Sequence, residues 1–104
     1  MLSKLINWDV YEVIAESSPL EGVKFRGRVR KFCLEAGRNI LIENAEDMKN
    51  RVRFAIPSGE NVSKIIEYII RVVPDAKVVK IMDKVQNPVI SKLKVNSLER
   101  YKGL

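Results

Sequence analysis

The sequence predicts an α+β fold in which two helices cover one face of an antiparallel sheet. Three observations carry this prediction. Two segments repeat apolar residues with helical spacing, four shorter segments are apolar and rich in β-branched residues, and the two kinds follow one another in the order β-α-β-β-α-β. The 104 residues, 46% of them hydrophobic, suffice for one domain with a single core.

The first half of the chain contains one strand, one helix and a second strand. The first strand is expected at 11–15, before the turn-like sequence Ser17-Ser18-Pro19. From Val23 the apolar residues recur at i, i+4, i+7, i+8 and i+11, which places Phe25, Val29, Phe32, Cys33 and Ala36 on one helix face. Gly37 is the expected C-terminal stop of this helix, and the second strand is expected at 39–43.

The second half begins with a polar connection at 44–50 and a third strand at 52–56. The strongest helical pattern follows, with apolar residues at i, i+3, i+4, i+7, i+8 and i+11 from Val62 to Val73. A fourth strand is expected at 77–85, and a fifth at 89–95 along the edge of the sheet.

This order of elements is typical of the ferredoxin-like β-α-β-β-α-β sandwich. In that arrangement the third strand lies between the first and second strands, which therefore run parallel and end at the same end of the sheet. We expect the loop at 18–23, Arg26 and Asn44 to converge there. The chain is predicted to be a single domain, 1–104, with a core at about 11–95 and short N- and C-terminal extensions.

The composition excludes several kinds of site. The chain has one cysteine and no histidine, which excludes an internal disulfide framework, a cysteine-histidine zinc site, and catalysis by Ser-His-Asp or Cys-His groups. No acidic cluster suggests a metal ion, and we expect no cofactor. Cys33 lies on the apolar stripe of the first helix and is expected to be a core residue.

The net charge of +6 implies attraction to anions, either phosphate groups or nucleic acid. Nucleic acid is not the expected partner, because the third strand offers one aromatic residue, Phe54, and the fourth offers none for stacking bases. No apolar run approaches the about 20 residues of a membrane span, and the N-terminus lacks a signal peptide's apolar stretch. We expect a cytoplasmic monomer without membrane contact. The abundance of Lys, Glu, Ile and Val beside a single Gln is a thermophile-like composition.

The segment Glu21-Gly22-Val23-Lys24-Phe25-Arg26 has the layout of a small anion site. The first N–H groups of a helix have no partner within the helix, and the helix dipole adds positive charge there. Arg26, one turn inside, could grip a phosphate or a carboxylate through two parallel N–H bonds.

The chain resembles the acylphosphatase family at these residues. That family carries a signature of the form G-x-V-Q-G-V-x-F-R after its first strand, and here the aligned residues are Ser18-Pro19-Leu20-Glu21-Gly22-Val23-Lys24-Phe25-Arg26. The family's asparagine at the end of the second strand falls on Asn44, within Ile42-Glu43-Asn44. A later pattern, P-x-A-x-V-x-x-V, reappears from Pro74 to Ile81. The resemblance runs from about Tyr11 to Val95.

The resemblance implies a hydrolase that cleaves the carboxyl-phosphate bond of a small acyl phosphate without a metal ion or cofactor. Arg26 and Asn44 would be the catalytic residues, with Asn44 positioning the attacking water. Leu20, Glu21, Gly22 and Val23 would form the phosphate-binding loop.

Four differences from the family pattern leave a second hypothesis open. Ser18, followed by Pro19, replaces the family's first loop glycine, and Glu21 replaces a glutamine. Glu43 replaces a basic residue, and Ala45 replaces a hydroxyl residue. The alternative is a catalytically inactive module of the same fold that binds an anion or a protein.

Overall fold

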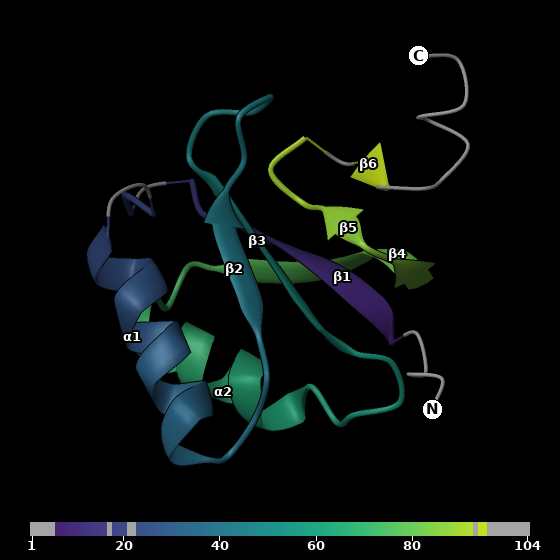
Figure 1. Ribbon diagram of the computed structural model, residues 1–104. Coiled ribbons are helices and arrows are strands. Elements are labelled where there is room, and N and C mark those ends of the chain that lie inside the picture. Colours follow the sequence, from purple (N-terminus) through teal and green to yellow (C-terminus); the bar gives the residue numbers. More distant parts are fainter. Residues whose placement is uncertain (1–5, 17, 21–22, 93, 96–104) are drawn as a thin grey trace, which may run out of the picture.

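Two helices lie against one face of a four-stranded antiparallel sheet (Figure 1). The computed structural model describes residues 6–16, 18–20, 23–92 and 94–95. The strand order is β2-β3-β1-β4, and the elements are β1 (Asn7–Ile14), α1 (Val23–Glu35), β2 (Leu41–Asn44), β3 (Arg51–Pro57), α2 (Ser63–Val72) and β4 (Lys77–Gln86). This arrangement confirms the predicted α+β class and is compatible with a ferredoxin-like fold.

The main core lies between the sheet and the two helices. Alternate residues of a strand point to the same face, so Tyr11 and Val13 of β1 join Phe54 of β3 on the helix side. The rings of Tyr11 and Phe54 stack, with 5.1 Å between their centroids. The helices contribute the fully buried side chains predicted from their apolar stripes: Val29 and Cys33 from α1, and Ile65 and Ile69 from α2.

The end of α1 is confirmed at the predicted glycine. Gly37 has a φ of 69°, a left-handed conformation that a residue without Cβ adopts at little cost. The Arg38 N–H then donates to the carbonyl oxygen of Cys33 at 2.8 Å, which closes the helix with the reversed bond expected after a C-terminal glycine. The chain therefore turns back sharply, and β2 runs antiparallel to α1 (Figure 1).

β1 begins at Asn7, four residues before the predicted start at Tyr11. The sequence at 7–9 contains polar residues and does not predict a strand. In the structure, Trp8 pairs with Pro57 of β3 on one side and with Val85 of β4 on the other. Asp9 is buried, and its carboxylate accepts hydrogen bonds from the Ser58 hydroxyl at 2.7 Å and from the Lys84 N–H at 3.0 Å. These partners allow an acidic residue to occupy a strand interior.

The stability of the protein should depend on the ionisation of Asp9. Burial raises the pKa of this carboxyl, but the hydrogen bonds from Ser58 and Lys84, and the Lys80 ammonium, outweigh burial and lower the pKa below the ordinary value of 3.8. A carboxylate with a lowered pKa contributes stability above the unfolded pKa and loses it as the pH falls through the folded one. We expect Asp9→Asn to cost about 1–3 kcal/mol at pH 7.

Urea unfolding of wild type and Asp9→Asn at pH 7 and at pH values below 3.8 measures this contribution. The difference between the two proteins should shrink as the pH falls. A difference that stays constant across this range would show that the charge of Asp9 does not contribute.

The prediction of a fifth strand at 89–95 along the edge of the sheet is wrong. Two short strands, β5 (Pro88–Val89) and β6 (Lys94–Val95), pair with each other as a separate two-stranded sheet. Asn87, with a φ of 46°, turns the chain after β4. Ile90 then packs against Val10 and Ala55, in a cluster separate from the main core. The segment that carries β5 and β6 lies on the side of the sheet away from the helices (Figure 1). The apolar residues of this segment therefore cover a face instead of extending an edge.

None of the helices in the described part of the chain is long and apolar enough to cross a membrane. Residues 1–5 of the predicted N-terminal extension and the whole predicted C-terminal extension, 96–104, lie outside the described residues.

Candidate functional site

The C-terminal ends of β1 and β2 flank the beginning of β3. Ile14, the last residue of β1, is opposite Arg51, and Asn44, the last residue of β2, is opposite Val52. Because neighbouring strands are about 4.8 Å apart, the two strand ends are separated by only about 10 Å. This agrees with the prediction that the first two strands run parallel and end at the same end of the sheet.

Asn44 presents a buried acceptor that has no partner among the described residues. Its Oδ1 atom is buried and accepts no hydrogen bond from any of the residues that the structure describes. A buried polar atom without a hydrogen bond costs about 1–3 kcal/mol, and such atoms are uncommon in folded proteins. An unpaired acceptor at a strand end is therefore a position where a donor such as water would be stabilised.

Arg26 lies on the first turn of α1, half-buried, at the same end of the molecule. Arg30, one turn further along, donates from Nη2 to the carbonyl oxygen of Ile42 in β2 at 3.2 Å. This hydrogen bond ties α1 to β2, which run in opposite directions. The beginning of α1 and the C-terminal end of β2 therefore lie at the same end of the molecule (Figure 1).

The loop between β1 and α1 is anchored at two points. Leu20 is fully buried, and its N–H donates to Oδ1 of Asn50 at 2.6 Å. The Ser18 hydroxyl donates to the Asp75 carboxylate at 2.6 Å, which ties the loop to the turn after α2. Of the predicted phosphate-binding residues, Val23 is the first residue of α1, whereas Glu21 and Gly22 lie outside the described residues, as does Ser17 of the predicted turn.

Asn50 holds the loop before α1 in place, a role that the sequence did not predict, since it indicated only a polar connection at 44–50. Besides the bond to Leu20, its Nδ2 donates to the carbonyl oxygens of Ala15 at 3.0 Å and Ser18 at 2.9 Å. One side chain therefore holds the loop before α1 against the start of β3. The available signal was an asparagine directly before a strand, a residue type that favours turns in any case.

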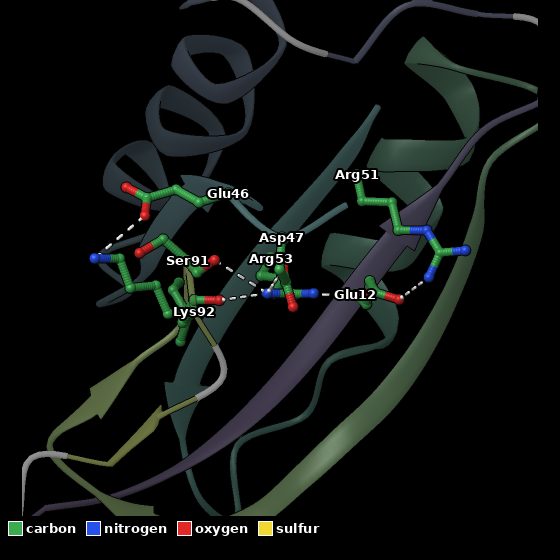
Figure 2. Close-up of polar contacts among 8 residues, drawn as sticks. Glu12, Glu46, Asp47, Arg51, Arg53, Ser91 and Lys92 are labelled. Carbon is green, nitrogen blue, oxygen red and sulfur yellow. Dashed lines mark hydrogen bonds and ion pairs between the residues drawn. The ribbon is translucent and has the colours of Figure 1, made fainter. Parts of the chain in front are cut away.

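Arg53 forms a second feature that sequence reasoning missed. Its side chain is 1% exposed and lies on the sheet face opposite the helices (Figure 2). Nε donates to Glu12 at 2.9 Å, and Nη1 contacts Asp47 at 2.7 Å. Nη1 also donates to the carbonyl oxygens of Ile90 at 3.1 Å and Ser91 at 3.2 Å. This cluster fastens the C-terminal segment over the sheet.

The same cluster reaches the connection that follows Asn44. The Glu46 N–H donates to the Ser91 carbonyl oxygen at 2.9 Å, and the Lys92 ammonium lies 3.5 Å from the Glu46 carboxylate (Figure 2). Burial alone would lower the pKa of Arg53, but Asp47 and Glu12 raise it, and the hydrogen bond from Arg53 lowers the pKa of Asp47. The guanidinium is therefore held in its charged form. Its contact with Asp47 ties the connection after Asn44 to the sheet face opposite the helices.

The described residues form neither a metal-binding site nor a reactive cysteine. Within ranges 6–16, 18–20, 23–92 and 94–95, no group of three His, Cys, Asp or Glu side chains could hold a metal ion. Cys33 is fully buried, and burial raises the pKa of its thiol, so it is not placed to act as a nucleophile.

Comparison of the chain with protein-family models, curated proteins and solved structures finds no match.

Proposed function

We propose that this protein is an acylphosphatase-like hydrolase that cleaves the carboxyl-phosphate bond of acyl phosphates. The observation that carries the proposal is the buried Oδ1 of Asn44 at the end of β2, which has no hydrogen-bond partner among the described residues. The first turn of α1, which carries Arg26, lies at the same end of the molecule (Figure 1). The resemblance of the sequence from Ser18 to Arg26 supports it, as does the element order of a ferredoxin-like fold.

In this proposal, Asn44 accepts a hydrogen bond from a water molecule and holds it for attack on phosphorus. A bond forms between the water oxygen and phosphorus, and the bond between phosphorus and the carboxyl oxygen breaks. The products are a carboxylate and inorganic phosphate, and the proton of the water passes to phosphate or solvent. Because a carboxylate is a good leaving group, positioning and electrostatic stabilisation suffice for the reaction.

The phosphate would be held by the Arg26 guanidinium and by backbone N–H groups of the loop at 20–23. Arg26 can bind two phosphate oxygens at once, and the dipole of α1 favours an anion at this end. The Leu20 N–H already donates to Asn50, so the amides offered to a phosphate in this proposal are those of Glu21, Gly22 and Val23.

Hydrolysis of benzoyl phosphate in the presence of a metal chelator tests the proposal. Wild type should release phosphate, whereas Arg26→Ala should lose about 10²–10³-fold in kcat/KM, because one charged donor to the reacting group is removed. Arg28→Ala is the matched control: it removes the same charge from an exposed position on the same helix and should retain activity. Circular dichroism of each variant monitors folding.

Two results would count against this proposal, the first against the activity and the second against the role of Arg26. If folded wild type hydrolyses no benzoyl phosphate at any temperature up to the onset of its thermal unfolding, the activity is excluded. Equal losses in Arg26→Ala and Arg28→Ala would show that α1 attracts the substrate by its general charge and not through Arg26.

The second candidate function is a catalytically inactive module that binds an anion or a protein through the same end of the sheet. The engagement of the Leu20 N–H by Asn50 favours it, since one amide of the predicted cradle is already occupied. Binding of inorganic phosphate by wild type, without turnover of benzoyl phosphate, would support this function over the hydrolase.

A further inference from the structure

Two cavities between α1 and α2 together form an interhelical groove. The larger cavity, of about 370 Å³, is lined by Arg28, Lys31, Phe32, Glu35 and Tyr68. The smaller cavity, of about 250 Å³, is lined by Arg28 as well, and its lining includes Lys24 of α1 and Val72 of α2. Because Arg28 lines both cavities, they adjoin each other along α1.

One wall of the groove is a row of exposed cations. Lys24, Arg28 and Lys31 are at i, i+4 and i+7 of α1, a spacing that places them on one helix face over about 10 Å. No ion pair or side-chain hydrogen bond joins Lys24 or Arg28 to the described residues. The Lys31 ammonium lies 3.9 Å from the Glu35 carboxylate, but both side chains are largely exposed, so this pair is weak. The row of cations is therefore available to anions.

The other wall of the larger cavity is aromatic. Phe32 of α1 and Tyr68 of α2 stack with 4.4 Å between their ring centroids and an interplanar angle of 14°. Both side chains pack against the main core and are only partly buried, so part of each ring remains open to the cavity. A flat ligand can pack against these rings, and an arginine guanidinium stacks on such a ligand as well. The cavity volume is in the range of small-ligand sites.

We propose that the interhelical groove binds single-stranded nucleic acid, with phosphates held by the row of cations and a base packed against Phe32 and Tyr68. Cations along a groove, combined with aromatic rings, are the means by which proteins hold single strands without sequence preference. The net charge of +6 adds to the attraction. The sheet cannot supply this surface, because its one aromatic residue considered for stacking, Phe54, is fully buried.

The alternative anionic partners fit the groove less well. An acidic peptide would contact the cations but would leave the aromatic rings unused. A duplex keeps its bases stacked on one another, so it too would be held by charge alone. Binding in this groove is also separate from the proposed hydrolysis, because Arg26 and Asn44 line neither cavity.

Fluorescence anisotropy of a labelled oligothymidylate of about ten nucleotides, with the full chain, tests the row of cations. If three phosphates are neutralised, the logarithm of the association constant should fall with the logarithm of salt concentration with a slope of about −2 between about 50 and 200 mM salt. Lys31→Ala should weaken binding and bring the slope closer to zero by about 0.7. Lys49→Ala is the matched control, since it removes the same charge from an exposed position outside the groove, and it should bind as wild type does.

Two substitutions of Tyr68 test the aromatic wall. Tyr68→Leu removes the ring but keeps an apolar side chain against the core, and it should weaken binding about tenfold with the slope unchanged. Tyr68→Phe keeps the ring and should retain the wild-type affinity. Circular dichroism of every variant monitors folding.

Four results would overturn the proposal. These are the absence of oligothymidylate binding at about 50 mM salt, equal losses in Lys31→Ala and Lys49→Ala, wild-type affinity in Tyr68→Leu, and equal losses in Tyr68→Leu and Tyr68→Phe. Binding of a duplex of the same length, or of polyglutamate, as tightly as the single strand would also overturn it, because it would show attraction by charge alone.

Discussion

Asn44→Ala is expected to abolish most turnover of benzoyl phosphate without destabilising the fold. Loss of the group that orients the attacking water should lower kcat by about 10²-fold or more. The free energy of unfolding should stay within about 0.5 kcal/mol of wild type or rise, because the truncated Oδ1 is buried and makes no hydrogen bond with the described residues. Steady-state kinetics and urea unfolding measure the two effects.

Asn39→Ala is the matched control for this variant. Asn39 is exposed and lies before the opposite end of β2, so its loss should affect neither turnover nor stability. If Asn44→Ala retained wild-type kcat, water positioning by Asn44 would be excluded. If it lost several kcal/mol of stability instead, Asn44 would have a structural role in the strand end.

Arg53→Met is expected to cause the largest loss of stability, about 3–5 kcal/mol, because removal of one partner leaves buried charge and unpaired acceptors behind. The variant deprives Glu12 of a partner and leaves the carbonyl oxygens of Ile90 and Ser91 without the guanidinium. For a domain of this size, the loss corresponds to a fall in Tm of more than about 10 °C. Urea unfolding at pH 7 measures it.

Arg51→Met separates the buried guanidinium from a general effect of charge. Arg51 also pairs with Glu12, at 3.0 Å, but its side chain is 31% exposed, so we expect a loss below about 1 kcal/mol. The double variant Glu12→Gln/Arg53→Met should recover part of the stability lost in Arg53→Met, because the carboxylate left behind is neutralised. Equal losses in Arg51→Met and Arg53→Met would contradict the special role of burial.

The order of the helices and main strands could be predicted from the sequence because each buries one face against the main core. Val29 and Cys33 of the first stripe and Ile65 and Ile69 of the second follow helical periodicity and are fully buried as it predicts. The margins of the stripes were predicted less well: Ala36 is exposed beyond the end of α1, and Ile70 is 44% exposed. Gly37 marked the end of α1 through local backbone geometry alone. Arg26 and Asn44 stood out through the resemblance to the acylphosphatase signature and through the predicted order of elements, and their convergence at one site stays a prediction.

The features that were not predicted depend on contacts between distant parts of the chain. Arg53 occupies an alternate position of β3 that would face water in a sheet covered on one side only, and a charged residue there is ordinary. Its burial follows from Ile90 and Ser91, 37 and 38 residues later. Asn50 has the residue type of any turn, and only the fold shows that its side chain reaches Leu20, 30 residues earlier.

The contacts of Arg53 also determine which part of this protein can fold last during its synthesis. A chain emerging from the ribosome presents β1, β3 and both helices well before it presents Ile90 and Ser91. Until those residues arrive, the guanidinium lacks two carbonyl partners, and Val10 and Ala55 lack their apolar cover. The second face of the sheet therefore matures last, and a nascent chain halted before Ile90 would carry an exposed apolar surface of the kind that chaperones bind.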